Sequence, residues 1–139
     1  MASMTLELAE ECIRRVKAKA TEMNINLSIA VLDEAGKMVA FARMGHIRGG
    51  FGEKLAIAKA RTAVGFRRTT QESLDRYAGL PANYYIIQTA ALYPGEFCVV
   101  PGGAPIVING EFLGGVGVSG STSDNDHKCV TEAIVGITV

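Results

Sequence analysis

The sequence predicts a mixed α/β fold of the α+β type, with a five-stranded antiparallel sheet and helices packed on it. Two observations predict this fold. Five short apolar segments have strand-like length and composition, and turn residues rather than long crossovers dominate between them. Segments with apolar residues at spacings of three and four lie before, between and after these strands, as expected of helices that cover a sheet. The 139 residues are enough for one domain, residues 1–139, with a single core.

The N-terminal half predicts, in order, a helix, a β-hairpin and a second helix. The segment Thr5–Met23 has an amphipathic pattern and begins with a threonine that can cap a helix. The apolar runs Leu27–Leu32 and Lys37–Met44 flank a short turn that contains glycine, which is typical of a hairpin. A loop with four glycines, Gly45–Gly52, separates this hairpin from the predicted helix Glu53–Phe66.

The C-terminal half predicts a short helix, three strands and a last helix. Thr69–Tyr77 has a capping threonine and an early glutamate, whereas Tyr84–Ala91 fits either a helix or a loop. The dipeptide Asn109-Gly110 is a strong hairpin signal. The expected strands are Phe97–Val100, Ala104–Ile108 and Phe112–Ser119, and the expected last helix is Asp126–Ile137, after a capped start in Ser121–Asp126.

Composition excludes several classes of function. Fourteen basic residues balance fourteen acidic ones, so the clustered positive charge of a nucleic-acid-binding protein is missing. No apolar run reaches the roughly 18 residues that span a bilayer, and no signal peptide is visible, so we expect a cytoplasmic protein without a membrane partner. Three widely spaced cysteines without a CxxC pair predict neither a disulfide framework nor a zinc site. A net charge of zero favours homo-oligomers, because copies do not repel one another.

Two glycine-rich segments are candidate ligand contacts. Gly102 and Gly103 can bring backbone N–H groups close to a small anion, or they can form a tight turn that leads into a strand. Gly114–Gly120 has GxGxxG spacing, but it alternates valine with glycine like a strand, so we do not predict a dinucleotide site. Ser119, near its end, is a candidate pocket residue. Ser121–Asp124 either binds an anion or caps the last helix.

Arg43, Lys59 and Thr62 are the candidate cluster for a ligand carboxylate. Arg43 ends an apolar strand, Lys59 and Thr62 lie about one turn apart on a helix face, and a cation with a hydroxyl suits an anionic substrate. A surface salt bridge is the alternative. We expect the pocket between the Gly45–Gly52 loop, this helix and the Gly102–Pro105 turn. Its apolar wall would come from Ile47, Phe51 and Phe97.

The two histidines, His46 and His127, are the candidate catalytic residues. His46, in the glycine-rich loop, can act as a heme ligand, a metal ligand or a general base. It has no HxH or HxxxH companion, so an exposed imidazole without a ligand is the alternative. His127 can form an acid–base pair with Asp124 or Asp126, or lie at the surface, because adjacent residues on a helix do not face each other. We predict no metal site.

Segments spread along the chain carry a family resemblance. They are Ser28–Gly36, Val39–Met44, Ala56–Ala63, Gly102–Ile106, Gly114–Gly120 and Asp126. Together and in this order they resemble the GlcG/HbpS-type heme-binding proteins, which include the C-terminal domain of PduO. The resemblance covers almost the whole chain and implies a profilin-like fold that assembles into dimers or larger rings. Some members bind heme or cobalamin-related ligands, so the resemblance makes heme one candidate for a cofactor that the sequence leaves unknown. The predicted first helix has no histidine, so it cannot supply an axial histidine ligand.

The preferred interpretation is a small-ligand-binding accessory protein of a catabolic operon, whose ligand is an organic acid or a tetrapyrrole. The operon context is implied by the resemblance alone. One alternative is an enzyme that acts on a small carboxylated intermediate by proton transfer or elimination. In that enzyme Arg43 or Lys59 would bind the carboxylate, and His46 or His127 would move the proton. A purely structural assembly partner is the other alternative, and all three stay open at this point.

Overall fold

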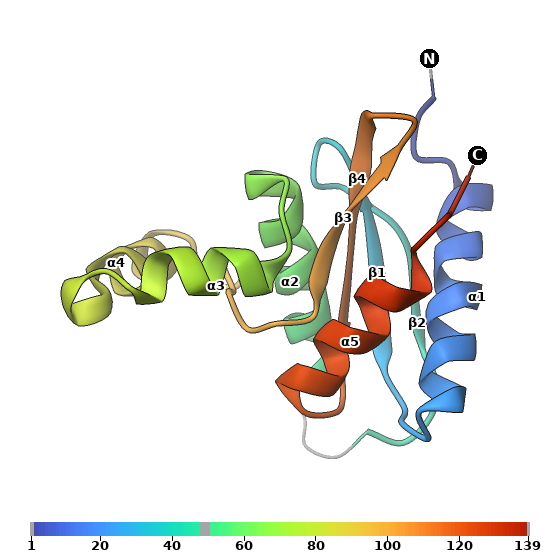
Figure 1. Cartoon of the computed structure of the whole chain (residues 1–139), viewed down its shortest axis with the longest axis horizontal. Coiled ribbons are helices and arrows are strands. Elements are labelled where there is room, and N and C mark those ends of the chain that lie inside the picture. The colour runs from blue at the N-terminus through green and yellow to red at the C-terminus, as the bar shows by residue number, and fades with distance from the viewer. Residues whose placement is uncertain (1, 48–50, 139) are drawn as a thin grey trace.

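The structure is a computed structural model that describes residues 2–47 and 51–138, and Figure 1 shows its arrangement. Apart from the strand expected at Phe97–Val100, the helices and strands occur in the predicted order. The elements are α1 (Leu6–Glu22), β1 (Ser28–Asp33), β2 (Met38–Arg43), α2 (Gly52–Phe66), α3 (Thr70–Ala78), the 3-10 turn η1 (Pro81–Asn83), α4 (Tyr84–Leu92), β3 (Gly103–Ile108), β4 (Glu111–Ser119) and α5 (Ser123–Ala133).

The strands form one antiparallel sheet between two layers of helices. Its order is β2-β1-β4-β3, and every pair of neighbours is antiparallel. Alternate residues of β1 point to opposite faces. Ile29 and Val31 join the core beneath α1 and α5, whereas Ala30 and Leu32 pack against α2. Figure 1 shows the same layers, with α2 on one side of the sheet and α1 and α5 on the other.

The prediction of a fifth strand at Phe97–Val100 is wrong, because the sheet has four strands. This segment lies beside α2, where the backbone N–H of Cys98 donates a 2.8 Å hydrogen bond to Oγ1 of Thr62. A side chain therefore satisfies an amide that a ladder partner would otherwise have taken. The α+β class, the antiparallel pairing and the hairpin of β1 and β2 are confirmed.

Local capping explains most of the helix boundaries. Thr5, Thr69 and Thr122 each accept a backbone N–H through Oγ1 and so begin α1, α3 and α5. The last helix starts earlier and ends earlier than predicted, and Gly136 with φ +74° lies beyond its end. The undecided segment at Tyr84 is helical. Part of the Gly45–Gly52 loop, residues 48–50, lies outside the described residues.

Helices α3 and α4 project from the body of the molecule as an arm (Figure 1). No residue of α4 is buried, although the helix is mostly apolar. An aromatic cluster joins the arm to α2. The rings of Tyr77 and Tyr85 stack with centroids 4.1 Å apart, and Phe66 lies 5.6 Å from Tyr77 and 6.1 Å from Phe97. The arm therefore meets the body through aromatic contacts and leaves its outer apolar side uncovered.

Candidate functional site

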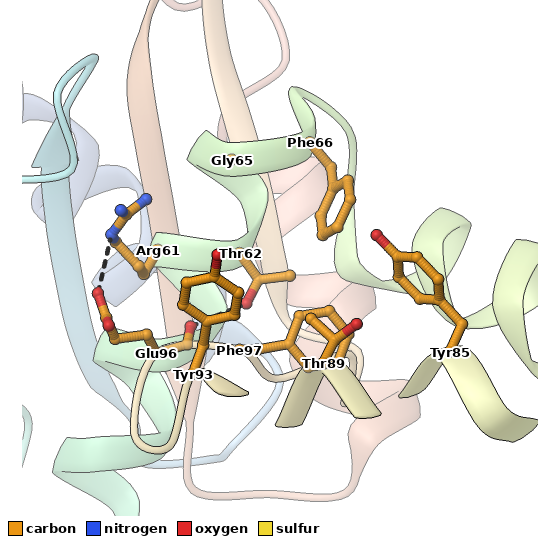
Figure 2. A pocket seen from close by; sticks show the side chains of 9 residues that line it. All are labelled: Arg61, Thr62, Gly65, Phe66, Tyr85, Thr89, Tyr93, Glu96 and Phe97. Carbon is orange, nitrogen blue, oxygen red and sulfur yellow. Dashed lines mark hydrogen bonds and ion pairs between the residues drawn. The ribbon is translucent and has the colours of Figure 1, made fainter. Parts of the chain in front are cut away.

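A groove lies between α2, α4 and the segment that follows α4. We call it the aromatic groove, and its volume is about 310 Å³. It is lined by Arg61, Thr62, Gly65, Phe66, Tyr85, Thr89, Tyr93, Glu96 and Phe97. Figure 2 shows the four rings around this space, contributed by α2, α4 and the following turn. Apolar walls with a few polar groups are typical of small-molecule sites.

The polar groups of the groove differ in how free they are to bind a ligand. Thr62 is buried, and its hydroxyl lies 2.8 Å from the Ala58 carbonyl oxygen and 3.1 Å from the Glu96 carbonyl oxygen while accepting from Cys98. The Thr62 side chain therefore links α2 to the segment that follows α4. Arg61 is part-exposed, and its Nε lies 3.6 Å from Oε1 of Glu96 (Figure 2). An exposed ion pair of this length is weak, so Arg61 can exchange Glu96 for a ligand anion.

Lys59 is buried inside the molecule and does not face the groove. Only 1% of the residue is exposed, and Nζ lies 2.9 Å from the Val118 carbonyl oxygen and 3.1 Å from Oδ2 of Asp126. The other carboxylate oxygen of Asp126 accepts the Ser121 backbone N–H at 3.1 Å. Burial raises the pKa of Asp126, while the neighbouring Lys59 ammonium opposes that rise. The pair joins α2 to the start of α5 across the end of β4.

The predicted cluster of Arg43, Lys59 and Thr62 is not brought together by the fold. Arg43 is exposed at the end of β2, at one edge of the sheet. Lys59 reaches β4 and the beginning of β3, toward the other edge. Thr62 is the one predicted ligand-binding residue that lines the aromatic groove. The groove therefore lies away from the pocket expected at the Gly45–Gly52 loop.

Gly102 and Gly103 allow close packing at the start of β3. A Cβ atom on Gly102, which has φ +134°, would lie 2.8 Å from the Val118 carbonyl oxygen and 2.9 Å from Lys59 Nζ. A Cβ on Gly103 would overlap the Lys59 carbonyl oxygen. Their backbone groups are used internally, because Gly103 donates to Oγ1 of Thr70 at 3.0 Å and Gly102 accepts from Val118 at 2.8 Å. Here the turn interpretation fits the geometry better than the anion contact.

Known proteins are similar to this chain over almost its whole length. A family model described as haem degrading protein HbpS-like matches residues 4–135. A protein of Citrobacter freundii, an uncharacterized 15.0 kDa protein in the dhaT-dhaS intergenic region, is 31% identical over 135 residues, which cover 96% of this chain and 92% of the relative. The chain belongs to the HbpS-like family. The resemblance to GlcG/HbpS-type proteins is therefore confirmed.

Further members and solved structures agree with this assignment. Protein GlcG of Escherichia coli K12 is 31% identical to this HbpS-like chain over 116 residues, covering 84% of the chain and 81% of GlcG. A double mutant of HbpS from Streptomyces reticuli has a TM-score of 0.82 at 26% identity, covering 100% of this chain and 90% of that chain. The PduOC:heme complex has a TM-score of 0.84 at 23% identity, covering 98% and 96%, and shows the shared fold.

Neither histidine of this HbpS-like protein lines the aromatic groove. His46 is exposed, and its carbonyl oxygen accepts the side-chain amide of Asn26 at 3.3 Å. His127 is half-buried on α5. No hydrogen bond joins His127 to Asp124 or Asp126 among the described residues, and the buried Nδ1 of His127 has no partner there. Within residues 2–47 and 51–138, no three metal-ligating side chains cluster.

Sequence reasoning missed three of the four rings of this groove. Phe97 was predicted as an apolar wall residue, and it does line the groove, together with Phe66, Tyr85 and Tyr93. Tyr85 lies on α4, which the sequence left undecided, and Tyr93 is the residue that follows this helix. The adjacent residues Tyr84 and Tyr85, in an otherwise apolar segment, were the signal available in the sequence. Among the described helices, none is long and apolar enough to cross a bilayer.

Proposed function

We propose that this HbpS-like protein is an accessory binding protein whose ligand is a planar tetrapyrrole such as heme, held in the aromatic groove. The observation that carries the proposal is the set of four rings that line one open groove. Aromatic faces stack on flat apolar surfaces, and such pairs add to the free energy of burial. The related PduOC protein has been crystallised as a heme complex, which supports a tetrapyrrole as the planar ligand.

The residues of the groove fit a tetrapyrrole in their chemistry. Phe66 and Phe97 offer apolar contact for the macrocycle, and Arg61 can pair with a carboxylate on its edge. An iron ligand would come from a tyrosine oxygen rather than from histidine, because Tyr85 and Tyr93 line the groove. Burial and the neighbouring Tyr77 raise the pKa of Tyr85, which disfavours its phenolate, so Tyr93 is the better candidate.

A second copy of the chain would complete this site. The volume of about 310 Å³ lies near the lower end of the roughly 300–1,000 Å³ usual for small-molecule pockets, so part of a macrocycle would stay uncovered in a monomer. The exposed apolar side of α4 borders the groove and can pack against another copy. We therefore include homo-oligomerisation in the proposal, and we keep the cytoplasmic location expected from the sequence. The alternative of an enzyme that acts on a small carboxylated intermediate finds no support in the comparisons.

A hemin titration followed by the Soret absorption band tests the proposal. Tyr93 and Tyr84 give a matched pair, because both are 55% exposed but only Tyr93 lines the groove. We expect Tyr93→Ala to weaken hemin binding about tenfold, a loss of roughly 1.4 kcal/mol, because it removes both a ring contact and the candidate oxygen ligand. Tyr84→Ala should bind hemin like the wild type. Equal affinities of the wild type and Tyr93→Ala would place the ligand elsewhere.

A further inference from the structure

A row of polar side chains crosses the end of the sheet beside Gly52, at the start of α2, whereas the aromatic groove is lined by residues 61–66 of the same helix. Ser28 of β1 lies directly opposite Arg43 of β2 on one side and Ser119 of β4 on the other. Residues directly opposite one another in antiparallel strands project from the same face. That face is the one covered by α2, because Ala30, two residues beyond Ser28, packs there. One arginine and two serines therefore share a line on the α2 side.

The hydroxyl of Ser28 is the unusual member of this row. Ser28 is 1% exposed, and its Oγ has no hydrogen-bond partner among the described residues. A buried hydroxyl without a partner is unfavourable, so it calls for an explanation. A Cβ atom built on Gly52 would lie 3.5 Å from this Oγ, so the hydroxyl faces the first residue of α2.

The beginning of α2 adds backbone N–H donors that have no acceptor within the helix. Phe51 is the N-cap and offers no side-chain hydrogen bond, and the first intrahelical bond there runs from Leu55 N to the Phe51 carbonyl oxygen. The N–H groups of the first turn, from Gly52 to Lys54, consequently lack helical acceptors. A helix N-terminus carries partial positive charge and favours an anion. Glu53 also lies in this turn but is exposed.

The site admits only a small group and is open at one edge. An atom at the Gly52 Cβ position would lie 3.5 Å from Ser28 Oγ and 3.6 Å from Cγ2 of Ile47, so the space beside Gly52 admits one oxygen of a small carboxylate. Gly52 and Ile47 are part-exposed, and Arg43 is exposed. An anion can therefore enter beside Arg43, whose guanidinium forms paired hydrogen bonds with carboxylates.

We propose that Ser28, Ser119, Arg43 and the first-turn N–H groups of α2 form a binding site for a small aliphatic carboxylate. The site is separate from the aromatic groove and does not depend on the function proposed for it. Ser28 Oγ and the N–H groups of α2 donate to the carboxylate oxygens, Arg43 supplies the opposite charge, and Ser119 contributes a second hydroxyl. The Ser28 hydroxyl thereby gains the partner that it lacks within the described protein.

The probe is sodium acetate, with acetamide as a neutral molecule of the same shape and sodium chloride as the ionic-strength control. Acetate should raise the unfolding temperature of the wild type above the value in chloride, and acetamide should not, because only the folded protein binds the anion. Ser28→Ala and Arg43→Gln should each weaken acetate binding about tenfold or more, since hydrogen bonds to charged groups are the stronger kind.

Ser73 provides the matched control for Ser28. It too is fully buried, with an Oγ that lacks a partner among the described residues, but it lies in α3, away from this row. Ser73→Ala should keep the acetate affinity of the wild type. Without acetate, Ser28→Ala should unfold at the wild-type temperature or above it, because it loses no hydrogen bond. Equal effects of acetate and acetamide, or an unchanged acetate affinity in Ser28→Ala, would overturn the proposal. Hemin binding should not change in any of these variants.

Discussion

Lys59 is the residue on which three elements of this protein meet. Its ammonium lies between the end of β4 and the start of α5, and Gly102 leaves the space that its Nζ occupies. A buried charge is tolerated only when it is paired and hydrogen-bonded, and here both conditions are met. Asp126 in turn holds the backbone of Ser121 at the entry to α5. The pair therefore positions backbone segments that the hydrophobic core alone would not orient.

We predict that Lys59→Met lowers the free energy of unfolding by about 3–5 kcal/mol, because it leaves the Asp126 carboxylate buried without its partner. Urea denaturation measures this loss. Lys54→Met is the control, because Lys54 is exposed on the same helix and should change little. Lys59→Met with Asp126→Asn should recover part of the loss, since the unpaired charge is gone. Equal losses for Lys54→Met and Lys59→Met would contradict the structural role of the pair.

The pH dependence of the Lys59→Met variant follows from the pKa of Asp126. Burial already raises that pKa, and removing the opposing Lys59 charge raises it further. An acid whose pKa is raised by folding stabilises the folded state while it is protonated, and this contribution is lost as the pH rises through the folded-state value. The free energy of unfolding of Lys59→Met should therefore fall short of the wild-type value by less at acid pH than at neutral pH. Urea midpoints across this range test it.

The thiols of Cys12 and Cys129 should be unreactive in the folded protein. Burial raises the pKa of both to about 11, so almost no thiolate exists near neutral pH. Cys98 is half-buried, and burial raises its pKa as well. A thiol-specific disulfide reagent should modify Cys98 first and the other two only after unfolding. Rapid modification of all three in the folded state would be the contrary result.

The same two thiols predict a loss of stability at alkaline pH. Their protonated forms stabilise the fold fully below the ordinary pKa of 9.0, and this contribution is lost as the pH rises through about 11. The loss should approach roughly 3 kcal/mol for each thiol. Urea denaturation should show a steeper decline for the wild type between these values than for the Cys12→Ala, Cys129→Ala double variant. Parallel declines would show that other groups dominate.

At the scale of elements, the glycines of β4 decide how closely α2 approaches the sheet. A Cβ atom on Gly117 would overlap the Ala56 carbonyl oxygen. A Cβ atom on Gly115 would lie 3.0 Å from the Ala60 carbonyl oxygen. Small residues on α2 face these glycines. The helix backbone therefore packs almost directly on the strand, which leaves little room for a ligand between α2 and the middle of β4.

We predict opposite effects of two glycine-to-alanine substitutions at this contact. Gly117→Ala should destabilise the protein, because the new methyl group meets backbone that cannot move away cheaply. Gly65→Ala, in α2 with open space around the Cβ position, should stabilise it by about 0.5–1 kcal/mol, since alanine has the higher helix propensity. Thermal unfolding of the two variants compares them directly. A stabilising Gly117→Ala would mean that α2 can shift from the sheet.

At the scale of the whole molecule, the α3–α4 arm leaves an apolar surface uncovered (Figure 1). Leu92 and Ile87 of α4 are both more than half exposed. Contiguous apolar surface of this kind marks an interaction site in a protein that lacks a membrane-spanning helix among its described residues. We propose that a second copy covers it, since the net charge is zero and copies do not repel one another.

We predict that the wild type sediments as a species larger than 14.7 kDa and that Leu92→Glu shifts it toward the monomer. A buried glutamate at an interface is unfavourable because its charge loses water. Val135→Glu is a matched control, because Val135 and Leu92 are both 73% exposed but Val135 lies near the C-terminus, away from α4. A monomeric wild type, or equal dissociation by both substitutions, would contradict a role of α4 in assembly.

Features that depend on neighbouring residues could be predicted from the sequence. The threonine caps of α1 and α3 are local hydrogen bonds, and the Asn109-Gly110 turn needs positive φ at both residues, which these two residue types tolerate. Strand alternation and helical spacing likewise act over a few residues, so the hairpins and most helices were predictable. The whole-chain family resemblance rested on the same kind of local motif.

Tertiary structure alone decided what depends on distant partners. Phe97–Val100 has the composition of a strand, but the Cys98 N–H donates to the side chain of Thr62, more than thirty residues earlier in the sequence. Helix α4 was undecided because its apolar residues show no period. Arg43, Ser28 and Ser119 meet only because β1 lies between β2 and β4. Lys59 and Asp126 pair although they lie 67 residues apart in the sequence. Residue type indicates which charges and hydroxyls exist, whereas strand order and burial determine which of them keep a partner within the protein and which face a ligand.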